Sequence, residues 1–114
     1  MAKFKFVEWL LLWLQENSHF EFDWDEGNRT KSAAKHSVRT DEAEEVFTLG
    51  HAAPLGIQIS PLAHEERLGI VGPTSEGRLL QVVFTLRDGK VRLISARPAH
   101  KKERKLYEAY IREI

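Results

Sequence analysis

Three β-strand candidates joined by very short connections constrain the fold of this chain more than any other feature. They are ERLGIVG, RLLQVVFTL and KVRLISA, at 66–72, 78–86 and 90–96. Asp88-Gly89, between the last two, is a strong signal for a two-residue hairpin. A turn at 75–77 joins the first two. Connections this short require antiparallel pairing, so the segment predicts a β-meander.

The middle candidate, 78–86, is apolar on both of its faces. Strands of this kind lie inside a sheet, so we expect helices to cover at least one side of it. Phe84 and Leu93 should contribute to the core.

Helical patterns stand before and after the meander. A closing helix should run from about Ala99, with an apolar stripe of Leu106, Tyr107, Tyr110, Ile111 and Ile114. Thr40 suits the N-cap of a helix over 41–49 that stops at Gly50. A short strand at 20–24 and a helix over 25–36 precede it, and 51–61 reads as a loop with an edge strand at 56–60. The predicted class is α+β, with an antiparallel meander sheet and helices on both sides of it in the sequence.

Residues 3–16 predict an amphipathic helix with Trp9, Leu10, Trp13 and Leu14 on one stripe. Its apolar run is far shorter than the ~20 residues of a membrane span, and no small-residue cleavage site follows it. We therefore expect no membrane partner. The helix should cover an apolar surface, either on the same sheet or across a homodimer interface. This divides the chain into an N-terminal helix extension, 1–18, and one domain, 19–114.

Composition limits the chemistry. The chain has 114 residues and no cysteine, which excludes disulfides and thiolate metal sites and fits a cytoplasmic protein. The histidines have no paired metal-ligand spacing. Residues 1–50 hold 10 acids and 6 bases, whereas 51–114 hold 7 acids and 11 bases. This asymmetry points weakly to an anionic partner, and mutual attraction of the two halves explains it equally well.

The most unusual feature is a helix start crowded with cations, RPAHKKERK at 97–105. Pro98 suits the first helical position, and no Ser, Thr, Asp or Asn at 97–99 caps the helix. Free N–H groups beside cations bind phosphate, although charge runs are commonly just solvated side chains. Lys35 and His36 end the helix over 25–36, and Arg67 and Arg92 lie in strands. RNA cleavage is one chemistry for such a basic surface, because the 2′-hydroxyl of the substrate is the nucleophile.

Residues 20–110 resemble the BrnT family of type II toxins. The resemblance rests on a run of short motifs whose order and spacing match: Trp24-Asp25, Lys35-His36, Glu42 to Phe47, Glu66-Arg67, Gly77 to Leu80, Ile94 to Arg97, and Lys101 to Glu108. It implies a RelE-like fold, an RNA endonuclease that halts translation, and a BrnA-like antitoxin as partner. The chain departs from the family pattern in the helix over 25–36, where it has Asn28, Ser32 and Ser37.

The resemblance also implies roles for seven residues. Arg97 would stabilise transition-state charge, as its place at a strand end also suggests, and Lys35 and His36 would transfer protons. Arg67 and Arg92 would bind substrate phosphates, and Lys101 and Arg104 the RNA backbone.

Two hypotheses follow for the function. The first is a metal-independent endoribonuclease without cofactors. The second is a non-enzymatic interaction domain on the same scaffold that binds an acidic or antitoxin-like partner. The retained ISARPAHKKER segment favours the first, and the altered helix over 25–36 and the N-terminal helix favour the second.

Overall fold

The hairpin at Asp88-Gly89 forms as predicted in the computed structural model, which describes residues 2–17, 19–23 and 38–113. Both turn residues have positive φ, 52° and 77°, the geometry that matches the twist of the flanking strands. The hairpin joins β4 (Leu79–Arg87) to β5 (Lys90–Pro98). Phe84 and Leu93 are cross-strand neighbours in it, and both are buried.

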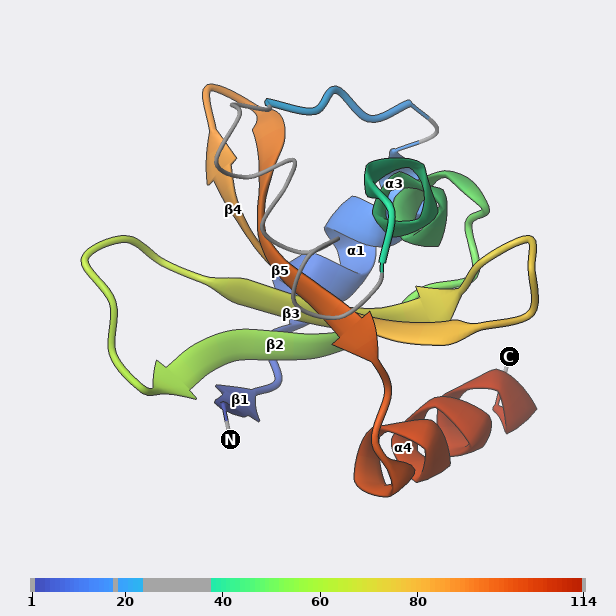
Figure 1. Ribbon diagram of the computed structural model, residues 1–114. Coiled ribbons are helices and arrows are strands. Elements are labelled where there is room, and N and C mark those ends of the chain that lie inside the picture. The colour runs from blue at the N-terminus through green and yellow to red at the C-terminus, as the bar shows by residue number, and fades with distance from the viewer. Residues whose placement is uncertain (1, 18, 24–37, 114) are drawn as a thin grey trace.

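The sheet has five strands in chain order, β1-β2-β3-β4-β5, and all neighbours are antiparallel. The predicted meander and the α+β class are therefore confirmed. β3 (Leu68–Pro73) begins two residues later than the predicted strand, so Glu66 and Arg67 precede it. Figure 1 shows the sheet strongly twisted, with α1 and α3 on one side and α4 on the other.

The N-terminal prediction was wrong for residues 3–7. Lys3–Lys5 forms the edge strand β1, and helix α1 (Glu8–Glu16) begins only afterwards. β1 pairs with β2, with Phe4 opposite Gln58. Gly56 permits this pairing, because a Cβ there would lie 1.9 Å from the carbonyl oxygen of Lys5.

The loop predicted over 51–61 was also mostly wrong. Residues Ala53–Ser60 form β2, an eight-residue strand that lies between β1 and β3 rather than at an edge. Pro54 and Gly56 flank an irregularity in its pairing with β3. A bulge of this kind admits both residues into a strand, which is why their presence did not break it.

One face of the sheet is covered by α1 and α3 (Thr40–Thr48). These helices supply Leu10, Val46 and Phe47 to a core that also contains Leu68, Ile70, Leu80, Val82 and Phe84 from the strands. Trp13 stacks on Phe84 with a ring-centroid distance of 5.7 Å. Trp9, placed on the same stripe by the sequence, is 41% exposed. The N-terminal segment thus packs on the same sheet.

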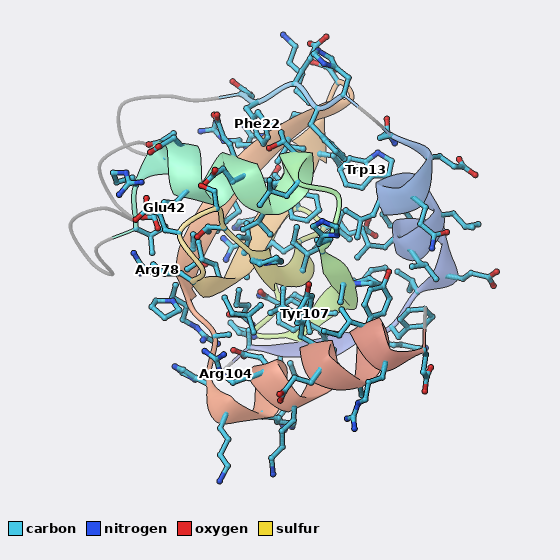
Figure 2. The ribbon with its side chains drawn as sticks, turned by 90° about the vertical axis from the view of Figure 1, so that its right-hand side faces the viewer. Trp13, Phe22, Glu42, Arg78, Arg104 and Tyr107 are labelled. Carbon is cyan, nitrogen blue, oxygen red and sulfur yellow. The ribbon has the colours of Figure 1, made fainter. Side chains whose placement is uncertain are left out.

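Helix α3 starts one residue earlier than predicted. Thr40 is its first helical residue and Arg39 is the N-cap, because the Glu42 carboxylate accepts the N–H of Arg39 at 3.1 Å. Glu42 is fully buried and also accepts two hydrogen bonds from Arg78, each 3.2 Å long; Figure 2 shows the two side chains together. The helix ends before Gly50, whose φ of 76° is the expected stop.

Helix α4 (Lys101–Arg112) packs on the opposite face of the sheet. Its Tyr107 lies in a second core with Ala53, Leu55, Val71 and Leu79 and donates a 2.9 Å hydrogen bond to the carbonyl of His51. Figure 2 shows Tyr107 on the side of α4 that faces the sheet. Leu106 and Ile111 of the predicted stripe are 44% and 41% exposed, and Ile114 lies outside the described residues.

Two predictions fall partly or wholly outside the described residues. Of the strand predicted at 20–24, Phe22 forms a single parallel bridge with Val91 of β5, and Trp24 is not described. The helix predicted over 25–36 is not described either. Within the described residues, no helix is long and apolar enough to cross a membrane.

Candidate nucleic-acid interface

Three arginines share the face of the sheet on which α4 packs. In β4 and β5, the side chains of Leu80, Val82, Val91, Leu93 and Ala96 belong to the core beneath α1 and α3. Because successive side chains of a strand point to opposite faces, Arg92 and Arg97 lie on the other face, opposite Thr85 and Gln81 respectively. Arg67 precedes Leu68, whose side chain is in the first core, so by the same alternation Arg67 is placed on that face as well.

Arg97 stands at the end of β5, as predicted, and is held by Glu103 of α4. Its Nη1 and Nη2 donate to the two carboxylate oxygens at 3.0 and 2.7 Å, and Nη1 also donates to the carbonyl of Pro98 at 3.0 Å. The side chains of Arg97 and Glu103 are 18% and 11% exposed. This pair therefore fixes the guanidinium plane relative to the start of α4.

Glu103 accepts four hydrogen bonds. Besides the two from Arg97, its oxygens accept the backbone N–H of His100 at 2.8 Å and Nε2 of Gln81 at 3.1 Å. Burial opposes its ionisation, but the hydrogen bonds from Arg97 and His100 outweigh burial and hold the pKa of the Glu103 carboxyl below its usual value. The residue is thus a carboxylate at neutral pH.

The predicted open helix start at Pro98 was wrong. Pro98 is the last residue of β5, opposite Leu80, and α4 begins at Lys101 with His100 as its N-cap. Glu103 occupies the third helical position and accepts the His100 N–H, as the acid of a capping box does. Its negative charge also offsets the positive end of the helix dipole. The protein's own carboxylate therefore sits where the sequence suggested a bound phosphate.

A second group of charges surrounds Glu65, at the other end of the same face. Glu65 accepts two hydrogen bonds from Arg87, 3.2 and 3.0 Å long. Hydrogen bonding from Arg87 holds the pKa of the Glu65 carboxyl below its usual value. Burial opposes this effect, and the charges of Arg87, Arg92 and Arg67 reinforce it. Arg92 is also paired with Asp23, at 3.5 Å. Arg67 and Arg92 thus act on one carboxylate, that of Glu65, and belong to one electrostatic cluster.

Arg67 has an unusual environment in that cluster. Its Nε atom is buried and has no hydrogen-bond partner among the described residues. A buried guanidinium nitrogen without a hydrogen-bond partner is costly, and a bound anion or water is one way to satisfy it. Across 2–17, 19–23 and 38–113, no three His, Asp or Glu side chains group to hold a metal ion.

A protein-family model described as the ribonuclease toxin BrnT of type II toxin–antitoxin systems matches residues 24–103, well over half of the chain. The chain belongs to the BrnT family. A crystal structure of the Brucella abortus ribonuclease toxin, BrnT, is similar in fold, with a TM-score of 0.52 and 22% sequence identity over 73% of this chain and 100% of that chain. No curated protein matches.

The family model places this BrnT chain in a family of ribonuclease toxins that work with an antitoxin. Its match begins at residue 24, so β1 and α1 lie outside it. The division of the chain at residue 18 remains a prediction, although α1 and the rest of the chain share one core.

The BrnT chain brings some of the predicted site residues together. Arg67, Arg92 and Arg97 share one face, while Lys101 and Arg104 are exposed in the first turns of α4; Figure 2 shows Arg104 at the N-terminal end of this helix. Lys35 and His36 lie outside the described residues. The sequence reasoning missed Glu103, although its spacing of three residues after His100 was a signal for a cap.

Proposed function

We propose that this chain is an RNA endonuclease that cleaves through attack by the substrate's own 2′-hydroxyl and thereby stops translation. The observation that carries the proposal is the arrangement of Arg67, Arg92 and Arg97 on one sheet face, next to the basic first turns of α4. Family membership supports the ribonuclease class. An array of guanidinium groups on a fixed sheet suits a polyanion whose phosphates must be oriented.

In the proposed reaction, O2′ attacks the adjacent phosphorus while the bond from phosphorus to O5′ breaks. The products are a 2′,3′-cyclic phosphate and a 5′-hydroxyl. One proton leaves the 2′-hydroxyl and one reaches O5′, and Lys35 and His36 are our candidates for these transfers. Arg97 would stabilise the extra negative charge of the phosphorane through charge-assisted hydrogen bonds.

Glu103 engages Arg97 from one edge of the guanidinium only. A guanidinium has five N–H donors. Two of those on Arg97 go to Glu103 and one to the Pro98 carbonyl. Within residues 2–17, 19–23 and 38–113, no hydrogen bond uses the N–H of Nε or the second N–H of Nη2, and these two donors form one bidentate edge. We therefore propose Glu103 as a positioning residue that fixes Arg97 from one edge while phosphate binds the other.

The remaining cations would bind the RNA on either side of the cleaved bond. Arg92 and Arg67, with its unpaired buried Nε, would contact one neighbouring phosphate, and Lys101 and Arg104 the backbone beyond α4. The proposed partner that neutralises the toxin is a BrnA-like antitoxin, whose acidic residues would compete with RNA for the same cations.

The direct test incubates the purified chain with a defined RNA and identifies the new ends. We expect a cyclic phosphate and a 5′-hydroxyl, and loss of cleavage in Arg97→Ala but not in Arg112→Ala, which removes a cation from the far end of α4. Equal loss in both variants would contradict the role of Arg97. Absence of cleavage together with Arg97-dependent binding of an antitoxin would favour the non-enzymatic alternative.

A test in cells addresses the toxin role. Induction of the chain in a bacterial host should arrest growth, and co-expression of a ribbon-helix-helix protein encoded next to it should restore growth. Arrest that persists in Arg97→Ala would show that the toxicity does not depend on the proposed chemistry.

A further inference from the structure

An open apolar groove lies between α4 and the N-terminal segment, and Gln81 and Glu103 at its edge also belong to the Arg97 site. It consists of two hollows of about 340 and 480 Å³. Leu55 and Leu106 line both of them, so the hollows adjoin. Phe4 and Phe6 form the wall opposite α4. β1, which supplies Phe4 to this wall, lies outside the family match.

Large apolar side chains on this groove remain exposed. Phe6 is 56% exposed, Ile59 50% and Leu106 44%. Single exposed apolar residues are ordinary, but a grouped set around a hollow marks an interaction surface. Apolar floor and walls of this kind suit a protein side chain better than a nucleic acid.

On the α4 wall of the groove, four residues are spaced symmetrically about a midpoint, with opposite charges at the two ends. Lys102, Leu106, Ala109 and Glu113 line it, at successive spacings of four, three and four residues, so they form one stripe along the helix. The midpoint between Leu106 and Ala109 is also the midpoint between Lys102 and Glu113. The stripe therefore has a base at one end, an acid at the other, and a large residue beside a small one in the middle.

We infer that a second copy of this chain occupies the groove, with the two α4 helices packed antiparallel about a twofold axis. This arrangement places Lys102 of each copy opposite Glu113 of the other, and Leu106 opposite Ala109. Opposite charges meet at both ends, and large side chains face small ones at the centre. A twofold interface requires such self-complementarity, because the same patch serves both copies.

Other occupants fit the groove less well. A uniformly acidic segment would meet Glu113 at one end, and a uniformly basic one would meet Lys102 at the other. Arg104 stays outside this dimer interface, because it is two residues from both Lys102 and Leu106 and so points to the opposite side of the helix. The groove borders the Arg97 site, since Gln81 and Glu103 line it as well.

The test measures self-association of the full chain by sedimentation equilibrium over a concentration series. The wild type should be a reversible dimer. Lys102→Glu and Glu113→Lys should each weaken association about tenfold, because each places like charges opposite one another at both ends of the stripe. The double variant carrying both reversals restores opposite charges and should dimerise within about threefold of the wild type.

Two further variants test the apolar centre. Leu106→Ala should weaken the dimer, whereas Ile111→Ala should not, because Ile111 is similarly exposed, at 41%, but lies on the other flank of α4. Circular dichroism and thermal midpoints confirm that each variant is folded. A wild type that stays monomeric, or a double variant as weak as either single reversal, would overturn the inference. If the wild type is monomeric and these variants lose antitoxin binding, the groove is a binding site for the antitoxin instead.

Discussion

Truncation of Trp13 to alanine tests whether the N-terminal segment belongs to the folded core. The Trp13 ring stacks on Phe84 of β4 at a centroid distance of 5.7 Å and an interplanar angle of 23°. It also meets Phe20 edge-on at 5.3 Å. If α1 is part of the domain, removal of this ring must lower the free energy of unfolding of the whole chain.

The magnitude follows from burial. Replacing a fully buried aromatic residue by alanine costs about 3–5 kcal/mol. Trp13 is only partly buried, which places it at the low end, but its ring contacts with Phe84 and Phe20 add to the loss. We expect a decrease of about 3 kcal/mol in the free energy of unfolding, or about 12 °C in the melting temperature of a domain of this size.

Urea denaturation followed by far-ultraviolet circular dichroism measures this change, since tryptophan fluorescence is itself altered by the substitution. Trp9→Ala is the matched control, because it removes the same side chain from the same helix at a position that is 41% exposed; it should cost less than about 1 kcal/mol. Similar losses in the two variants, or a Trp13→Ala loss below about 1 kcal/mol, would refute the integration of α1 into the core.

Three further predictions concern the site and the sheet. Arg97→Lys should impair cleavage far more than RNA binding, because it keeps the charge and loses the bidentate edge. Lys101→Ala should instead lower the affinity for RNA and reduce the salt dependence of binding by roughly one counterion. Equal catalytic loss in the two variants would contradict the assignment. Because the folded-state pKa of Glu103 is lowered from its ordinary value of 4.5, the stability that it contributes is present above that pH and is lost as the pH falls through the folded-state pKa. Acid titrations of wild type and Glu103→Gln should therefore converge at low pH. Gly56→Ala should destabilise the fold by at least about 2 kcal/mol more than Gly77→Ala: both positions have positive φ, but only at Gly56 would a Cβ meet the backbone of β1.

Local signals predicted the central part of the fold. The Asp88-Gly89 turn and the apolar strand 78–86 were sufficient for the β3–β4–β5 meander, because residues close in the sequence form these contacts. Such signals could not predict β1. Its three residues show no pattern of their own, and their conformation is set by pairing with β2, more than 50 residues away. β2 could not be predicted for a similar reason. Pro54 argues against a strand in the sequence alone, and the bulge that admits it depends on the neighbouring strand.

The candidate site was predictable by residue type but not by arrangement. Arg97 was identified from its place at a strand end, but strict alternation would put Arg92, five residues earlier, on the opposite face. The irregularity in the pairing of β5 with β4 brings both to one face, and nothing in the sequence indicates it. The partner of Arg97 was not predicted. Glu103 is the one acid in a run of basic residues, and the run was interpreted by its cations alone. Lys35 and His36 remain predictions, since the described residues do not include them.

The two faces of one strand explain how stability and the proposed chemistry coexist in so small a domain. In β4, Phe84 packs under Trp13 and Phe47, while Gln81, on the other face, hydrogen-bonds the carboxylate that holds Arg97. A shift of one residue in the pairing of β4 with β5 would exchange these faces and bury the arginines. The aromatic cluster beneath α1 therefore does more than stabilise the sheet. By fixing which side chains are buried, it also fixes which side chains remain on the face that we propose for RNA.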